Sequence, residues 1–125
     1  MALIRTWRVA LVGCGGMGRH HLRALKTIPG FEIAAICDIL PEALGRSGEE
    51  YGVPVRYADC ETMYREVRPD IVTVATQTRS HHAPTVAALR MGISTLCEKP
   101  IAIDLIEADE MVTASKASGA KLAIC

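Results

Sequence analysis

The chain of 125 residues lacks a surplus of charge of either sign. Lys and Arg together number 14, as do Asp and Glu, so the formal net charge at neutral pH is zero. A chain that binds nucleic acid or an acidic membrane surface through its overall charge needs a positive surplus. The balance therefore predicts no nucleic-acid partner and no attachment to an acidic membrane surface.

Long hydrophobic runs are also missing, although half of the residues are hydrophobic. No uninterrupted apolar segment approaches the ~18 residues that a membrane-spanning helix requires. The opening segment MALIRTWRV has no apolar stretch of the kind found in a secretory signal. We therefore expect a cytoplasmic protein without a membrane partner.

The cysteines form neither a disulfide framework nor a metal-ligand pattern. They are odd in number and include no C-x-x-C pair, and no histidine has the partner set of a zinc site. We expect them to behave as small hydrophobic residues and predict no metal site. Cys14 alone lies in a glycine-rich turn at a helix start, where a thiolate can be stabilised. The five are Cys14, Cys37, Cys60, Cys97 and Cys125.

The segment from Arg8 to Gly18, RVALVGCGGMG, is the feature around which the rest of the chain is arranged. Three glycines, Gly13, Gly15 and Gly18, follow an apolar strand in the pattern G-x-G-x-x-G. The first permits a tight turn, the second lets a pyrophosphate approach the backbone, and the third lets the helix lie close to the strand. The helix start then presents free N–H groups to the phosphates. We expect this loop, with Cys14, Gly16 and Met17, to bind a dinucleotide.

Short apolar runs alternate with helical patterns along the whole chain, without an internal repeat or a linker. This alternation predicts an α/β fold of the Rossmann type, a doubly wound parallel sheet in three α/β/α layers that spans residues 1–125. Apolar residues predict one inner face on the first helix (Met17, His21, Leu22, Leu25) and one on the last (Leu105, Ala108, Met111, Val112). The expected strands are 9–12, 31–37, 55–57, 71–75, 95–97 and 122–124, and helices are expected after Gly13 and over 41–51, 59–67, 84–91 and 104–118.

Asp38 closes the second predicted strand, 20 residues after Gly18. A dinucleotide fingerprint places an acidic residue there to accept hydrogen bonds from the adenosine ribose hydroxyls. Its charge would repel a 2′-phosphate, and Ile39 and Leu40 provide no cation to offset that repulsion. We therefore expect NAD rather than NADP. Capping of the helix that begins near Pro41 is compatible with the same role.

Two further loops follow strands at the edge where parallel sheets bind ligands. The fourth strand leads into a loop with Ala75, Thr76, Gln77, His81 and His82, and we expect one of these histidines to contact the nicotinamide half. The fifth leads into Glu98-Lys99-Pro100. Lys99 is a candidate general acid or base, with a group that orients a substrate hydroxyl and a solvated surface lysine as alternatives. Glu98 offers a neighbouring carboxylate, and Pro100 rigidifies the turn, with a cis bond as one option.

These motifs together resemble the N-terminal nucleotide-binding domain of the Gfo/Idh/MocA family (glucose–fructose oxidoreductase, inositol dehydrogenase and rhizopine catabolism). The resemblance covers essentially the whole chain through VALVGCGGMG, ICD, PDIVTVAT, the H-x-P helix and LCEKP. The glycine loop is common to many dehydrogenases, whereas Glu98-Lys99-Pro100 after the fifth strand is the most specific element.

The resemblance implies NAD(P)-dependent hydride transfer to or from a sugar, a cyclitol or a related carbonyl or alcohol substrate. It implies that Lys99 is the substrate-contacting and catalytic lysine, with Glu98 and Pro100 shaping its turn. Thr76 and one histidine would line the nicotinamide pocket. His81 fits that histidine by its distance from Thr76, and His82 fits by the Ala83-Pro84 that follows. Gln77 stands where the family commonly has Pro or Asn.

Family members continue into a second α/β domain that completes the substrate site and usually forms the oligomer interface. That domain is absent from this sequence, so we expect the chain to bind NAD but to catalyse poorly or not at all alone. A homo-oligomer is compatible with the missing domain. The alternative function is a stand-alone, non-enzymatic NAD-binding or redox-sensing module, and a scaffold that has lost its ligand is a third.

Overall fold

The computed structural model describes residues 4–125 and contains one six-stranded parallel sheet. The strands lie in the order β3-β2-β1-β4-β5-β6, so the sequence order reverses between β1 and β4. The strands are β1 (Trp7–Val12), β2 (Phe31–Cys37), β3 (Arg56–Tyr57), β4 (Ile71–Val74), β5 (Ser94–Cys97) and β6 (Leu122–Ile124). This confirms the predicted doubly wound Rossmann-type sheet.

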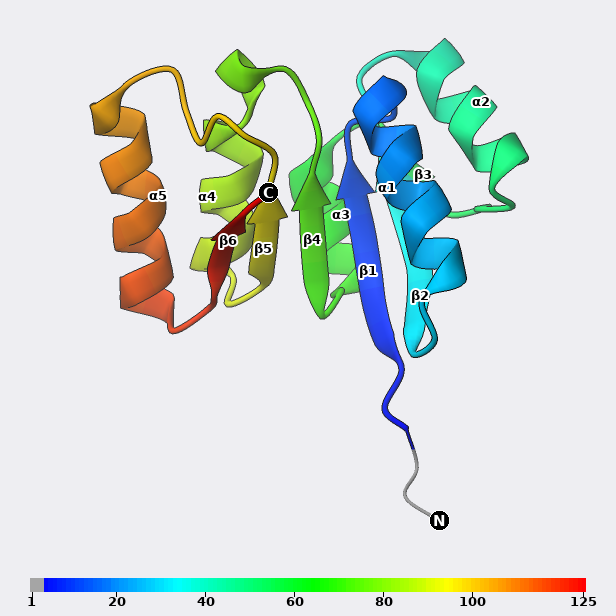
Figure 1. Cartoon of the computed structure of the whole chain (residues 1–125), viewed down its shortest axis with the longest axis horizontal. Helices are drawn as coiled ribbons and strands as arrows, with labels where there is room; N and C mark the ends of the chain where they lie inside the picture. The colour runs from blue at the N-terminus through cyan, green and yellow to red at the C-terminus, as the bar shows by residue number, and fades with distance from the viewer. Residues whose placement is uncertain (1–3) are drawn as a thin grey trace.

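Helices connect successive strands and cover both faces of the sheet, with α1 in front and α3 behind in the view of Figure 1. The helices are α1 (Gly16–Thr27), α2 (Pro41–Glu50), α3 (Cys60–Val67), α4 (His82–Arg90) and α5 (Leu105–Ser118), with a short 3-10 turn η1 (Thr78–Ser80) before α4. Asp59 and Asp104 cap α3 and α5 by accepting hydrogen bonds from the backbone N–H groups of Thr62 and Glu107.

The core consists of two clusters, one on each face of the sheet, because successive side chains of a strand point to opposite faces. Along β1, Leu11 packs with Leu22 and Ile36 on one face, whereas Ala10 and Val12 belong to the larger cluster on the other. A strand buried on both faces needs apolar residues at every position, which explains its continuous hydrophobic run. Both layers therefore hold β1 and the glycine turn that follows it.

Three details of the predicted helices are wrong. α4 begins at His82 rather than at Pro84, because a proline in the first turn of a helix loses no hydrogen bond. Met17 is half exposed at the start of α1. On α5, Leu105 and Val112 face solvent and Met111 is buried, because α5 lies at the end of the sheet and packs chiefly against α4 (Figure 1).

Candidate functional site

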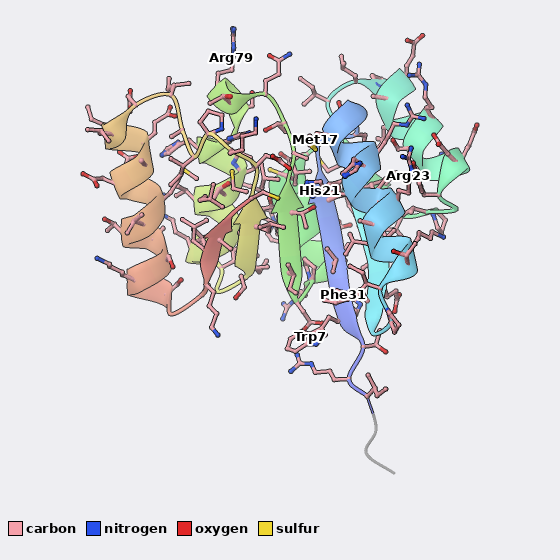
Figure 2. All side chains as sticks on the ribbon, in the orientation of Figure 1. Trp7, Met17, His21, Arg23, Phe31 and Arg79 are labelled. Carbon is pink, nitrogen blue, oxygen red and sulfur yellow. The ribbon has the colours of Figure 1, made fainter. Side chains whose placement is uncertain are left out.

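The carboxyl ends of β1, β4 and β5 bring the three predicted loops to one edge of the sheet. In Figure 2, Met17 and His21 lie on the half of α1 near that edge, whereas Trp7 and Phe31 lie at the opposite edge. The backbone of Ala75 donates to the carbonyl of Val12 at 2.8 Å, and so ties the loop after β4 to the end of β1. The topology thus gathers segments that are far apart in the sequence.

Two glycines of the turn are required by contacts within the chain itself. Gly13 has a φ of +99°, and a Cβ there would lie 2.7 Å from the carbonyl oxygen of Ala75. A Cβ on Gly18 would lie 1.8 Å from the carbonyl oxygen of Gly13. A larger residue at either position would clash with backbone atoms, so the backbone would have to shift. These contacts account for the first and third glycines through the close packing of the turn, β4 and α1.

Gly15 differs, because a Cβ at that position would meet nothing within 4 Å. It is the N-cap residue of α1 and provides no side-chain cap, and the first turn of the helix holds no acidic residue. The N–H groups of a first helical turn have no partner within the helix. The exposed backbone at Gly15 and Gly16 is therefore free to receive an anion, as a pyrophosphate requires.

Cys14 lies in the same turn, but its side chain points into the core. The residue is 1 % exposed, and its thiol lies 3.6 Å from the carbonyl oxygen of Cys37. Burial, and secondarily the charge of Asp38, raises the pKa of the thiol to about 12. Burial therefore disfavours the thiolate, and Cys14 contributes to the loop through its backbone.

Asp38 follows β2 and is joined directly to the glycine turn. One carboxylate oxygen accepts from the backbone N–H of Cys14 at 2.7 Å, and the other accepts from that of Leu40 at 2.8 Å. Each carboxylate oxygen has a further lone pair with which to accept a hydroxyl. The Leu40 contact supports the turn into α2, so ribose binding and helix support are compatible. The bond to Cys14 was not predicted from the sequence.

His81 and His82 have different surroundings, which the sequence left undecided. The His81 ring is 1 % exposed, with Nδ1 2.9 Å from the carbonyl oxygen of Pro100 and Nε2 3.1 Å from that of Thr76. His82 pairs instead with Glu110 of α5. The side chain of His82 therefore joins α4 to α5, whereas that of His81 lies between the two loops at the edge, and contact of either histidine with the nicotinamide stays a prediction.

The remaining residues of that loop lie at the edge. Thr76 is half-buried, and its hydroxyl donates to the carbonyl of Ser80 at 3.0 Å. Gln77 is exposed beside it. The backbone carbonyl of Thr76 lies against His81 Nε2, so hydrogen bonds within the loop maintain its fold. The amide side chain of Gln77 remains in solvent.

Glu98, Lys99 and Pro100 form the turn after β5, with a cis peptide bond between Lys99 and Pro100. Lys99 is exposed, whereas Glu98 is 8 % exposed. One oxygen of Glu98 accepts from His21 Nε2 at 2.8 Å, and this hydrogen bond is the main reason that the pKa of Glu98 lies below its ordinary value. The Glu98 carboxylate is thus directed into the protein and supports the turn.

His21 is the functional candidate that the sequence analysis missed. Its place in the sequence predicts only that it lies on the apolar face of α1, and there it is 9 % exposed. A histidine on the buried face of an amphipathic helix, three residues after the last glycine, requires a polar partner. That requirement was a usable signal, but the partner, Glu98, lies 77 residues away and could not be named.

Among the described residues, one group of three side chains lies close enough together to be considered as a metal site. His21, Glu98 and Cys125 place one ligand atom each within 4.8 Å of one another. Two ligands of one tetrahedral zinc ion lie about 3.3 Å apart, given bonds of about 2.0 Å. The 2.8 Å between His21 and Glu98 is shorter and fits a direct hydrogen bond between them.

The cofactor edge is separate from a groove of about 580 Å³ between α4 and α5. That groove is lined by Arg90, Ile106 and Glu110, among others. It includes none of the predicted site residues, although Glu110 is the partner of His82. Within residues 4–125, none of the helices combines the length and the hydrophobicity needed to cross a membrane.

Comparison with known proteins agrees with this geometry. The model of the oxidoreductase family with an NAD-binding Rossmann fold, Gfo/Idh/MocA, matches residues 7–124. D-apiose dehydrogenase of Paraburkholderia graminis is 35% identical over 121 residues, which cover 97% of this chain and 32% of that protein. The inositol 2-dehydrogenase/D-chiro-inositol 3-dehydrogenase of Lactiplantibacillus plantarum is 28% identical over 98% of this chain and 35% of its own length.

A solved structure shows the same arrangement of the backbone. The oxidoreductase from Agrobacterium radiobacter in complex with NAD+, L-tartaric acid and magnesium matches with a TM-score of 0.91 and 32% identity. The match covers 94% of this chain and 34% of that one. The chain therefore spans about a third of the length of the relatives it matches.

Proposed function

Because this chain belongs to the Gfo/Idh/MocA oxidoreductase family and matches the NAD-binding Rossmann domain of that family, we propose that it carries the cofactor half of a sugar or polyol dehydrogenase. The observation that carries the proposal is the division among the glycines. Gly13 and Gly18 are required by internal contacts, whereas Gly15 opens onto solvent at the N-terminus of α1. The relatives are dehydrogenases, so the stand-alone sensing module is not favoured.

The binding residues would divide the cofactor between the loops. Backbone N–H groups of Gly15, Gly16 and Met17 would face the pyrophosphate, and Asp38 would accept the adenosine ribose hydroxyls. The exposed apolar side chains of Ile39 and Leu40 offer no cation for a 2′-phosphate. These features support NAD rather than NADP as the ligand.

Lys99 would contact the substrate hydroxyl or carbonyl. Its side chain is exposed on the turn after β5, at the same edge as Gly15 and Thr76. Bound NAD supplies the acceptor or donor of the hydride. On reduction, the ammonium of Lys99 would donate a hydrogen bond to the substrate carbonyl oxygen and give it a proton; on oxidation, the neutral amine of Lys99 would take the hydroxyl proton as the hydride leaves the carbon. A sugar or cyclitol alcohol is the substrate class that the relatives support.

Calorimetric titration of the chain with NAD and with NADP, separately, tests this function without a substrate. We expect NAD to bind and to bind more tightly than NADP.

Gly15→Val should abolish binding, because the side chain would occupy the space through which the pyrophosphate approaches the backbone. The fold should be kept, because the added side chain meets no protein atom within 4 Å of its Cβ. Gly45→Val on α2 is the matched control, since that position is equally open and lies outside the site. Equal NAD affinity in wild type and Gly15→Val would contradict the phosphate-loop assignment.

A further inference from the structure

The position of Lys99 is set by its neighbours in the chain. Its side chain makes no hydrogen bond or ion pair with any of residues 4–125, and it is exposed. A long exposed lysine samples many rotamers, so the accuracy with which its ammonium reaches a substrate depends on how firmly the backbone at Lys99 is held. The residues that hold the turn on each side are therefore of interest.

On the Glu98 side, the turn is anchored to both β4 and α1. The backbone N–H of Glu98 donates to the carbonyl of Val74 at 2.9 Å. Its carboxylate accepts from His21 Nε2 at 2.8 Å with one oxygen and from the backbone N–H of Lys99 at 3.3 Å with the other. Because a carboxylate only accepts, His21 Nε2 must carry a proton in this arrangement. His21 thus fixes the group that holds the Lys99 amide.

On the Pro100 side, the turn is anchored to the loop after β4. The buried ring of His81 lies between two carbonyl oxygens, those of Pro100 at 2.9 Å and Thr76 at 3.1 Å. A neutral imidazole donates to one of them, and an imidazolium donates to both. His81 therefore sits at the contact between the Lys99 turn and the loop that the proposed nicotinamide site includes.

We propose that His21 and His81 are positioning residues for Lys99, two buried imidazoles that hold the Glu98–Lys99–Pro100 turn from opposite sides. His21 lies one turn of α1 beyond Gly18, so the hydrogen bond to Glu98 also fixes the Lys99 turn relative to the helix whose N-terminus faces the pyrophosphate. The relevance of this to catalysis rests on the proposed function of Lys99, whereas the positioning itself is measurable without cofactor.

The backbone amide of Lys99, observed in a ¹H–¹⁵N spectrum of the cofactor-free chain, tests the inference. In His21→Phe we expect its chemical shift to move and its exchange with solvent to accelerate about tenfold, as for loss of one charge-assisted hydrogen bond. In His21→Gln the side-chain amide restores a donor, so both values should return toward wild type. His20→Phe is the matched control, because His20 is the exposed neighbour on the same helix and should leave the Lys99 amide unchanged.

The Pro100 side has its own pair of variants. His81→Phe should alter the Lys99 amide, and His82→Phe should not, since His82 pairs with Glu110 away from the turn. An unchanged Lys99 amide in both folded His21→Phe and His81→Phe would overturn the inference, as would His21→Gln that resembles His21→Phe.

A measurement on the wild-type chain covers the case in which a variant does not fold. The ¹⁵N spectrum of the imidazoles should show His21 Nε2 protonated, and an unprotonated Nε2 would overturn the inference. None of these readouts requires NAD. A chain that fails to bind NAD but shows the predicted Lys99 behaviour would contradict the proposed function alone, and the opposite pair of results would contradict the positioning role alone.

Discussion

Asp38 combines two roles at the scale of a single residue. Its carboxylate accepts hydrogen bonds from the backbone N–H groups of Cys14 and Leu40, and it closes β2 at the edge where the glycine turn lies. A substitution there would therefore change the turn as well as the charge at the proposed ribose site. Under the proposed function, cofactor preference and the order of the loop would be linked through this one side chain.

The preference for NAD can be tested through Asp38 and its neighbour Ile39, which is 82% exposed. Asp38→Ser combined with Ile39→Arg should raise the affinity for NADP relative to NAD by about tenfold or more, because a repelling carboxylate is replaced by an attracting guanidinium. The absolute affinity for both should fall, since the serine reaches Cys14 and Leu40 less well. Calorimetry with both dinucleotides measures the ratio.

Asp38→Asn is the control for that experiment. It removes the charge and keeps one carbonyl acceptor for the turn, so the ratio should move in the same direction but less far. A ratio that stays constant across all three proteins would contradict a ribose-binding role for Asp38.

The spacing of Gly13, Gly15, Gly18 and Asp38 predicts that they lie at one edge, because it follows local backbone requirements. It does not predict the pairing of His21 with Glu98, which depends on where α1 lies relative to the end of β5. Side-chain contacts across that separation follow from packing rather than from spacing. The same reason left the choice between His81 and His82 open, since adjacent residues on a turn point in different directions.

At the scale of secondary-structure elements, α1 lies against the glycine turn so closely that one atom decides the contact. A Cβ on Gly18 would overlap the carbonyl oxygen of Gly13 at 1.8 Å; the carbonyl is backbone, and the position of the Cβ is fixed by the backbone at residue 18. Neither can move by rotating a side chain. The helix would have to withdraw from β1, which would also disturb the buried contacts of Leu22.

Gly18→Ala should therefore lower the free energy of unfolding by about 2–3 kcal/mol. Gly15→Ala, where the added methyl group meets only solvent, should change it by less than about 1 kcal/mol. Urea denaturation of both variants against wild type measures the difference. Equal stability of the two variants would show that α1 lies farther from the turn than the structure indicates.

The predicted strands and helices agree with the observed ones to within a few residues, because apolar runs, proline and glycine signal their limits locally. The inner face of α5 was predicted less well. Leu105, at 83% exposed, was expected to be buried. An end helix with one packed side needs only a narrow apolar stripe, and the sequence does not show that α5 is at the end of the sheet.

At the scale of the whole molecule, three carboxylates join parts of the fold that are distant in sequence or cap a helix. Asp70 accepts from the backbone N–H of Arg8 at 2.9 Å and from the Arg5 guanidinium at 3.0 Å, Asp59 caps α3, and Glu98 joins β5 to α1. Hydrogen bonds to each ionised group hold its pKa below the ordinary value. Each group therefore binds a proton less readily in the folded chain than in the unfolded chain.

This difference predicts that the chain loses stability in acid. A depressed folded pKa gives stability that is present above the unfolded values, 3.8 for Asp and 4.5 for Glu, and that disappears as pH falls through the lower folded values. Chemical denaturation at several values between about pH 7 and pH 3 should show a steady fall in the free energy of unfolding that begins near the unfolded pKa values.

In Glu98→Gln the free energy of unfolding should fall less steeply with pH, because the variant no longer takes up a proton at this site on unfolding. Glu32→Gln on β2 is the matched control, since the exposed side chain of Glu32 makes no hydrogen bond or ion pair within residues 4–125, and the pH profile of this variant should follow that of wild type. Identical profiles for Glu98→Gln and wild type would show that the His21–Glu98 pair does not hold the carboxylate in its ionised form.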